Sequence, residues 1–253
     1  MSAFLPPPGR LFVLTGAGIS AESGLATFRG TGGLWRGRRV EEVATPEAFA
    51  ADPRLVWRFY SERRRNASGA RPNPGHQALA RLEQALGERF FLCTQNVDAL
   101  HEAAGSRRIV HMHGRLDESR CSRPGCPTAP FRDTHRYHTA AEIPRCAACG
   151  SLIRPHICWF GEMPFELDRI REALEACAAC LVVGTSGVVE PAASFVRIAS
   201  AHGAQTLYVG PEAPANAGAF QEVRLGPSGV ALPALVPSWL GAAAGGRRPS
   251  DRS

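Results

Sequence analysis

The stretch LFVLTGAGISA (residues 11–21) joins a short apolar run to two closely spaced glycines. Its second half, GAGISA (16–21), matches the pattern G-x-G-x-x-[G/A] directly after the predicted strand. Glycines at these positions permit a tight turn and a close approach of the backbone to a pyrophosphate, and the start of the following helix stabilises the anion. The pattern therefore favours dinucleotide binding, with a purely structural turn as the alternative.

Four further apolar runs have the character of the first one. They are FFLCTQNVD (90–98), IVHMH (109–113), CLVVGTSG (180–187) and TLYVG (206–210). Between them, residues 72–86 and 165–179 carry apolar side chains at helical spacing. Continuous apolar strands that alternate with helices predict an α/β fold with a parallel, doubly wound sheet.

Two segments do not fit this alternation, and we interpret them as insertions that form a smaller second domain. Residues 31–70 are rich in arginine and tryptophan and include a helix-like run, and residues 117–150 contain two cysteine pairs. The predicted limits are 1–36, 72–116 and 151–240 for the large domain, with 37–71 as a helical module and 117–150 as a zinc module. Residues 241–253 are small, polar and basic, which predicts a disordered tail.

The composition indicates an ordinary globular protein. Of the 253 residues, 44% are hydrophobic and 21% are charged. No apolar run reaches the roughly 18 residues of a membrane span, and the first residues lack the layout of a signal peptide, so we expect a cytoplasmic protein that does not bind membranes. We also expect a monomer.

The net charge is +6, and all 29 basic residues are arginine. We interpret the absence of lysine as the codon bias of a GC-rich genome, with selection against lysine by lysine-modifying chemistry as the alternative. Because the arginines are scattered, they do not indicate a groove for sequence-specific nucleic acid binding.

Eight cysteines in a cytosolic chain argue against a disulfide framework. Four of them form two close pairs 20 residues apart, at a spacing typical of zinc sites: Cys121 and Cys126, then Cys146 and Cys149. Four thiolates leave no open coordination position, so the predicted metal site is structural.

Other residues could compete for this role. His135 and His138 lie between the two pairs, and either could replace a cysteine. Cys177 and Cys180 repeat the motif CAAC, but they adjoin the apolar run LVVG. We interpret this second pair as buried small side chains.

Polar residues follow the predicted strands in TQNVD (94–98) and GTSG (184–187). In an open parallel sheet such strand ends face one crevice, where ligands bind. His111 and His113 share one face of a strand. We interpret His111 as a structural histidine and His113, at the strand end, as a general base near neutral pH.

The chain departs from hydride-transferring enzymes after the glycine turn. Such enzymes carry an acidic residue about 20 residues further on, which binds a ribose. Here the sequence continues as TFRGTGGLWRG (27–37), and Glu41 and Glu42 fall in no predicted strand. We therefore expect the dinucleotide to be held in a different way.

Together these motifs resemble the sirtuin family of NAD-dependent protein-lysine deacylases. The matching pieces run in family order from Leu11 to Leu232: GAGISAESGLATFRG (16–30), TQNVD, HG (113–114), the four cysteines, WFGE (159–162) and GTS (184–186). The resemblance implies a Rossmann-like large domain, a small domain of zinc and helical modules, and NAD as a consumed co-substrate between them.

The resemblance also implies roles for individual residues. His113, with Asn96, would carry the chemistry by taking a proton from a ribose hydroxyl, and the partners would be acyl-lysine proteins or peptides. The implied NAD-binding residues are Gly16, Ala17, Gly18, Ser20, Ala21, Glu22, Thr27, Phe28, Arg29, Trp35, Gln95, Asn96, Val97, Asp98, Gly184, Thr185, Ser186, Glu212 and Ser228. The implied substrate-binding residues are Ala44, Tyr60, Arg63, Ile157, Trp159, Phe160, Gly161 and Glu162.

One position departs from the family. The family usually has Asn-x-Glu where this chain has Gly210, Pro211 and Glu212. Glu212 matches, but Gly210 offers no amide to the adenosine ribose. Ser228 matches a position on the adenine side.

Tyr60 and Arg63 lie three apart on a predicted helix and therefore share a face. The pair resembles the signature of class III sirtuins, which prefer succinyl-, malonyl- and glutaryl-lysine, and the small Ala44 matches as well. Arginine suits the carboxylate of such acyl groups because it donates two parallel hydrogen bonds. The alternative is a solvated basic face, and this is our interpretation of Arg64 and Arg65.

We therefore expect desuccinylation or demalonylation, with deacetylation as a second activity. A mono-ADP-ribosyltransferase on the same fold is the first alternative, and a non-catalytic NAD-sensing or zinc-ribbon module is the second. His113 and the predicted acyl channel favour deacylation over both.

Overall fold

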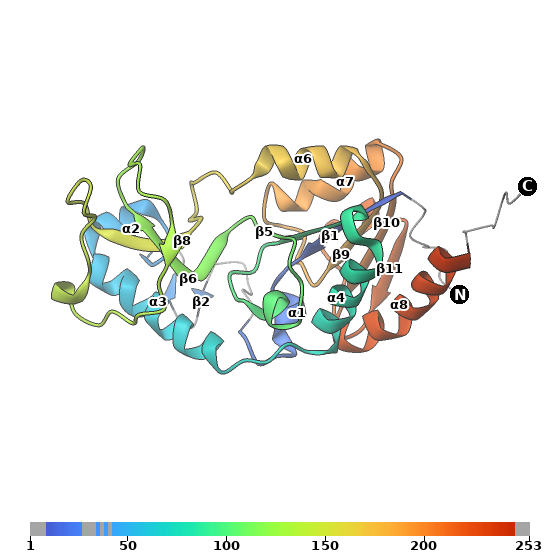
Figure 1. Ribbon diagram of the computed structural model, residues 1–253, viewed down its shortest axis with the longest axis horizontal. Coiled ribbons are helices and arrows are strands. Elements are labelled where there is room, and N and C mark those ends of the chain that lie inside the picture. Colours follow the sequence, from blue (N-terminus) through green and yellow to red (C-terminus); the bar gives the residue numbers. More distant parts are fainter. Residues whose placement is uncertain (1–8, 27–33, 36–37, 40–41, 246–253) are drawn as a thin grey trace, which may run out of the picture.

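Six strands form one parallel sheet in the larger part of the molecule, at the right of Figure 1. The computed structural model describes residues 9–26, 34–35, 38–39 and 42–245. The strand order is β11-β10-β9-β1-β4-β5. The bounds are β1 Arg10–Thr15, β4 Phe90–Thr94, β5 Ile109–His111, β9 Cys177–Val183, β10 Gln205–Gly210 and β11 Glu222–Leu225. The predicted α/β fold with a parallel, doubly wound sheet is confirmed.

Alternate residues of each central strand face opposite helix layers. In β1, Leu11 and Val13 pack with α4 and α8, whereas Phe12 and Leu14 pack with α6 and α7. Figure 1 shows these two layers on either side of the sheet. Burial of both faces favours apolar residues along the strands, which explains the continuous apolar runs. The helices are α1 Ala17–Ala21, α4 Pro74–Leu86, α5 Leu100–Ala103, α6 Leu167–Glu175, α7 Phe195–Ala201 and α8 Ser228–Gly245.

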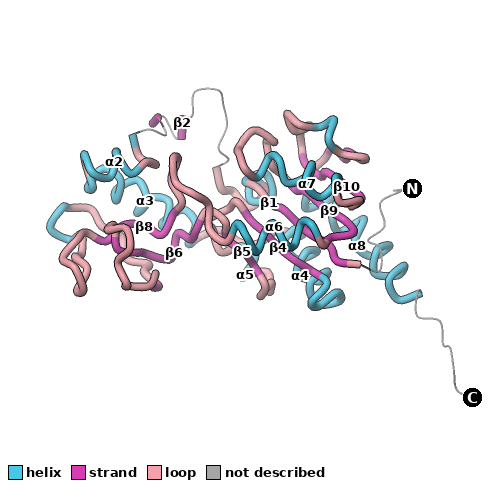
Figure 2. Tube along the Cα trace, turned by 90° about the horizontal axis from the view of Figure 1, so that it is seen from above, coloured by secondary structure: helices cyan, strands magenta, loops and turns pink. Residues whose placement is uncertain are grey.

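The smaller part combines two helices with an antiparallel sheet of order β7-β6-β8. Figure 2 shows it beside the larger part, with β5 and β6 near the junction. Its core contains Trp57, Tyr60, Tyr137, Ile153 and Trp159. The elements are α2 Pro46–Ala51, α3 Pro53–Ser68, β6 Gly114–Cys121, β7 Phe131–Arg132 and β8 Ile153–Ile157, with β2 Leu34–Trp35 and β3 Arg38–Arg39 as a separate antiparallel pair. Short 3₁₀ turns lie at Gly87–Arg89, Ala140–Glu142, Ala192–Ser194 and Ala217–Ala219.

Three helices begin with the same local device, a polar cap followed by proline. The side chains of Thr45, Asp52 and Asn73 each accept a hydrogen bond from a backbone N–H in the first turn of α2, α3 and α4. Proline at the first helical position needs no hydrogen-bond partner and has a helical φ angle. Asp52 therefore divides the helix-like run expected within residues 31–70 into two helices.

The interpretation of Arg64 as part of a solvated basic face is wrong. Arg64 is 7% exposed, and its guanidinium donates to Leu116 O at 2.6 Å and Ser119 Oγ at 3.1 Å and lies 3.3 Å from the Asp133 carboxylate. Several acceptors on β6 and beyond thus replace the water that burial removes. The same interpretation is confirmed for Arg65, whose side chain is 63% exposed.

The expected limits of several elements differ from the structure. The helix expected over 165–179 ends at Glu175, because Cys177 already begins strand β9. Helix α8 reaches Gly245, five residues into the expected tail, and residues 246–253 lie outside the described part. Strands β6 and β8 both pack in the smaller part, so we propose that its limits lie near Gly114 and Trp159. Among the described residues no helix has the length and apolar character needed to cross a membrane.

Candidate active site and metal centre

A cleft of about 640 Å³ lies where the carboxyl ends of the parallel strands face the smaller part, within the size range of small-molecule sites. We call the lining residues at or after the strand ends the sheet-tip wall: Gly16, Ala17, Gly18, Ser20, Gln95, Asn96, Val97, Asp98, His113, Gly184, Thr185, Ser186, Tyr208 and Glu212. The facing residues form the insertion wall: Ala44, Phe59, Tyr60, Arg63, Asn66, Leu116, Ile157, Trp159, Phe160, Gly161 and Glu162.

Two glycine turns meet backbone to backbone at the centre of the sheet-tip wall. Gly16 N donates to Val183 O at 2.9 Å, and Gly18 N donates to Gly184 O at 2.8 Å. A Cβ atom on Gly18 would lie 2.7 Å from Gly184 Cα, and one on Gly184 would lie 2.6 Å from Ile19 N. Side chains are therefore excluded at both turns, because the two backbones pack directly against each other.

A buried hydrogen-bond network fixes the end of β4. Asn96 is 7% exposed, and its Nδ2 donates to Gly16 O at 3.1 Å and to Ser20 Oγ at 3.0 Å. Ser20 Oγ in turn donates to Asp98 Oδ2 at 3.1 Å. Burial raises the pKa of Asp98, and hydrogen bonds from Leu100 N and Ser20 partly oppose the rise. Four of the predicted NAD-binding residues, Gly16, Ser20, Asn96 and Asp98, thus form one connected unit.

His113 lines the cleft at the point where the chain leaves the sheet. Its Nδ1 lies 3.2 Å from Gln95 O, and because a carbonyl only accepts, we infer that Nδ1 carries the proton. The lone pair of Nε2 then remains for a ligand. Burial lowers the pKa of His113, partly offset by the Gln95 contact, so the neutral imidazole is favoured at pH 7. This is the state that a general base requires.

His111 lies two residues before His113, but its ring nitrogens have different hydrogen-bond partners. Its Nδ1 lies 3.1 Å from Asn96 O, and its Nε2 lies 2.8 Å from Glu102 Oε1. Burial raises the pKa of Glu102, but the hydrogen bond and charge of His111 and the charge of Arg115 outweigh this and lower it to about 2. Both ring nitrogens of His111 are engaged by the protein, which supports its interpretation as structural.

The insertion wall is aromatic, with a cation beside it. Tyr60 is 1% exposed, and its hydroxyl accepts a hydrogen bond from Trp159 Nε1 at 2.9 Å. Burial raises the pKa of Tyr60 to about 12, with the charge of Arg63 opposing the shift. The phenol therefore keeps its proton and can donate it. The Arg63 guanidinium lies 5.9 Å from the centre of the Tyr60 ring.

Glu162 lines the cleft, but its carboxylate is held by the protein. It accepts from Arg154 at 2.6 and 2.9 Å, from Arg120 at 3.1 Å and from Trp159 N at 2.8 Å. The guanidinium of Arg154 lies 3.3 Å from the centre of the Trp159 ring. Glu162 thus orders the WFGE turn. Sequence reasoning missed Arg154, for which an arginine in an otherwise buried strand is the only signal.

Some predicted residues lie away from the cleft. Ser228 Oγ and Gly229 N donate to the Glu22 carboxylate at 2.7 and 3.0 Å, so Glu22 caps helix α8. Neither Glu22, Ala21 nor Ser228 lines the cleft. Thr27, Phe28, Arg29 and the side chain of Trp35 lie outside the described residues. Cleft residues that sequence reasoning missed include Asn66, Cys158, Pro164, Val189, Glu190 and Tyr208.

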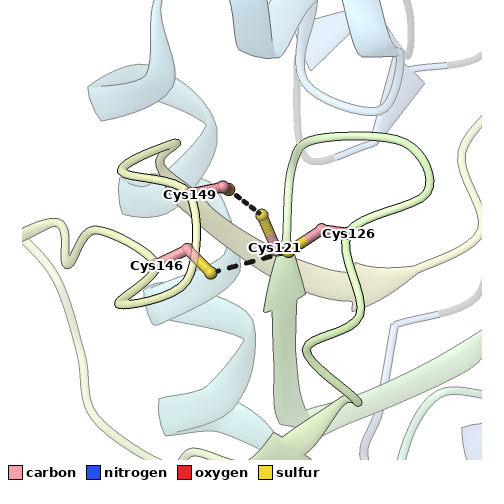
Figure 3. Close-up of side chains that lie close together, drawn as sticks. All are labelled: Cys121, Cys126, Cys146 and Cys149. Carbon is pink, nitrogen blue, oxygen red and sulfur yellow. Dashed lines mark hydrogen bonds between the residues drawn. The ribbon is translucent and has the colours of Figure 1, made fainter.

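Four cysteine side chains converge in the smaller part (Figure 3). Their sulfur atoms all lie within 4.8 Å of one another, with Cys121 and Cys149 at 3.4 Å and Cys126 and Cys146 at 3.7 Å. Four sulfurs tetrahedrally placed about 2.3 Å from zinc would be about 3.8 Å apart, so the donor set fits this ion. Among the described residues, neither His135 nor His138 belongs to the cluster. Cys177 and Cys180 are buried in β9, as predicted.

A parallel sheet with two glycine turns at a ligand-sized cleft defines a nucleotide-binding α/β protein. The model of the Sir2 family matches residues 16–191, and the chain belongs to this family. It is 49% identical to the NAD-dependent protein deacylase of Caulobacter vibrioides over 230 aligned residues. The alignment covers 90% of this chain and 95% of that protein. The corresponding protein of Salmonella typhimurium is 46% identical over 233 residues, with 91% and 84% covered.

Solved structures resemble the chain over most of its length. A crystal structure of a Sir2 homologue with NAD has a TM-score of 0.83 and 40% sequence identity, with 92% of this chain and 90% of that chain covered. A complex of Sir2 with a p53 peptide and NAD+ has a TM-score of 0.77 and 26% identity, with 90% and 92% covered.

Proposed function

We propose that this protein is an NAD-dependent protein-lysine deacylase. It takes acyl-lysine proteins or peptides, NAD and water, and it releases free lysine side chains, nicotinamide and O-acyl-ADP-ribose. The NAD-dependent deacylases to which the chain is 45–49% identical support this activity. NAD supplies the ADP-ribose that accepts the acyl group, with nicotinamide as the leaving group.

The position of His113 carries this proposal. Its Nδ1 contacts Gln95 O, and the side chain lines the cleft between the two walls. His113 takes a proton from a ribose hydroxyl, which makes that oxygen nucleophilic toward the acyl group. Asn96 and Asp98, held together through Ser20, orient the ribose next to it. Gly16, Gly18 and Gly184 line the cleft, where their backbone can approach the pyrophosphate.

The insertion wall selects the acyl group. We propose that Arg63 and the Tyr60 hydroxyl bind the terminal carboxylate of succinyl- or malonyl-lysine, and that the small Ala44 leaves room for it. A hydrogen bond to a charged group contributes about 1.5–3 kcal/mol, or roughly 10–150-fold in selectivity. An acetyl group lacks the carboxylate, so deacetylation is the slower, second activity.

The four cysteines hold one structural zinc ion in this proposal. Four thiolates complete a tetrahedral shell and leave no position for a substrate. The ion therefore contributes to folding and not to the reaction. We further propose a cytoplasmic monomer that binds neither membranes nor specific nucleic acid sequences, since the 29 arginines are scattered along the chain.

Mass spectrometry of acyl-peptides tests this proposal. The protein is incubated with succinyl-, malonyl- and acetyl-lysine peptides of one sequence, each with and without NAD. We expect NAD-dependent loss of the acyl group with equal amounts of nicotinamide and O-acyl-ADP-ribose, faster for succinyl or malonyl than for acetyl. Transfer of ADP-ribose to a protein without acyl loss would identify a transferase, and NAD binding without products would identify a sensing module.

A further inference from the structure

The space beside Gly210 is filled by a tyrosine hydroxyl from the same strand. Tyr208 and Gly210 lie two apart on β10 and therefore share one face of the sheet. A Cβ atom on Gly210 would lie 2.3 Å from Tyr208 Oη and 2.7 Å from Tyr208 Cζ. The end of the tyrosine ring thus occupies the position of any side chain at residue 210.

Tyr208 is held rigidly and still reaches the cleft. Only 2% of the residue is exposed, and its ring packs edge-on against Phe220 with the ring centres 5.6 Å apart. Tyr208 nevertheless belongs to the lining of the cleft, next to Thr185 and Glu212. A polar group on a packed ring loses little conformational freedom when it binds a ligand.

The hydrogen bond that the Tyr208 hydroxyl already makes determines which kind of ligand group it can bind. Tyr208 Oη donates its proton to Thr185 O at 3.2 Å. The phenol has only one proton, so its remaining capacity is that of an acceptor. Glu212, whose negative charge acts on Tyr208, is an acceptor as well. A ligand group that faces both residues must therefore donate hydrogen bonds, as the hydroxyls of a ribose do.

The strand order identifies which ribose lies there. His113 follows β5 at one edge of the sheet, whereas β10 lies on the other side of β1, beyond β9. The glycine turn after β1, where the pyrophosphate is expected, lies between them. A dinucleotide that places its reacting ribose at His113 therefore places its second ribose near the ends of β9 and β10.

We propose that the Tyr208 hydroxyl, which takes the place of a side chain at residue 210, accepts a hydrogen bond from a hydroxyl of the ribose farther from His113. This inference rests on the proposed function, because it takes NAD as the ligand. It gives the adenosine end of the cofactor a second contact beside Glu212, which the sequence does not reveal.

Calorimetric titration with ADP-ribose and NAD tests the inference. Tyr208→Phe keeps the ring and removes the hydroxyl, and we expect it to weaken binding about 2- to 12-fold, the range for one neutral hydrogen bond. In turnover assays the KM for NAD should rise by the same factor, with kcat unchanged. Tyr137→Phe is the matched control, because Tyr137 is buried in the smaller part and does not line the cleft.

ADP-ribose analogues that lack the 2′- or 3′-hydroxyl of the adenosine ribose separate a contact from a structural effect. For one analogue, wild type and Tyr208→Phe should bind equally well, because the donor is already absent. A 2- to 12-fold difference that persists with both analogues overturns the inference.

The outcomes also separate this inference from the proposed function. If the wild type binds ADP-ribose and turns over acyl-peptide, and Tyr208→Phe matches it in affinity and KM, the inference alone is wrong. If the wild type binds neither NAD nor ADP-ribose, the proposed function is wrong, and the inference is wrong with it.

Discussion

The two walls of the cleft are built by different interactions. In the sheet-tip wall, backbone and small polar groups bond to one another, as in the contacts of Asn96 with Gly16 and Ser20. In the insertion wall, Tyr60 and Trp159 join aromatic rings, with Arg63 beside them. The sheet-tip wall suits the steps with NAD, which are the same for every acyl group. The insertion wall suits the discrimination between acyl groups. We therefore expect separate mutations to alter catalysis and selectivity.

We expect the largest effect from removal of the zinc site, because the smaller part carries the insertion wall and depends on this site for its fold. Cys146→Ser should lower the metal content well below one zinc per chain and unfold the smaller part. Structural zinc contributes about 10–16 kcal/mol to folding in small zinc-binding peptides. Elemental analysis and limited proteolysis measure the two effects.

Cys177→Ser is the control for this experiment, because Cys177 belongs to the second CAAC motif and lies in β9. It should keep full zinc. Full occupancy in Cys146→Ser, or zinc loss in Cys177→Ser, would show that the metal site is assigned to the wrong cysteines.

His113→Ala tests the sheet-tip wall and should be nearly as severe for activity. Loss of a general base typically costs about 10²–10⁴-fold in rate. The loss of kcat/KM should be the same for succinyl- and acetyl-peptides, because the base acts on the ribose. Circular dichroism should show an unchanged fold. An active His113→Ala protein would rule out the base assignment, above all if His111→Ala were inactive.

Arg63→Met tests the insertion wall and should be selective. We expect succinyl-peptide turnover to fall roughly 10–150-fold, the value of a hydrogen bond to a charged group, with little change for acetyl-peptide. Arg65→Met is the matched control, because Arg65 lies on the same helix, is exposed and does not line the cleft. Equal losses on both peptides would mean that Arg63 supports the fold and does not bind the acyl group.

The smallest expected effect is on the pH profile. Burial lowers the pKa of His113 below its ordinary value of 6.5, so the neutral base persists at pH 6.5 and is lost only at lower pH. An unperturbed histidine would be half protonated at pH 6.5. Its neutral fraction would fall about 1.8-fold between pH 7.5 and pH 6.5. We therefore expect kcat/KM to fall by less than this factor over the same interval, equally for both acyl groups. A larger fall, or one that differs between the peptides, would contradict this assignment.

The sequence predicted most of the sheet-tip wall. Apolar strands, their polar ends and the glycine turn are local signals, and the parallel topology brings them together. Asn96 and His113 could therefore be identified without a structure. Glu22 and Ser228 could not be placed, because their contact with each other joins segments from opposite ends of the chain.

Contacts that depend on tertiary packing escaped prediction. The two CAAC motifs did not escape it, because their flanking residues distinguished the metal-site pair from the pair inside β9. In the sequence, Tyr208 looks like one more residue of an apolar strand. In the structure its hydroxyl lies beside Gly210 and donates a hydrogen bond to Thr185 O. Arg64 is interpreted from the sequence as an exposed charge, because the spacing of residues along a helix does not show which strand packs against that helix.

The buried Arg64 has a mechanical consequence. Its hydrogen bond and ion pair join helix α3 to strand β6 and Asp133. The helical segment and the cysteine-containing segment are therefore connected as one body. Arg64's sequence neighbours Tyr60 and Arg63 face the cleft, and the cysteine cluster lies on the same body. We therefore expect the state of the cysteine cluster to affect the position of the acyl-binding residues, although the cluster does not line the cleft.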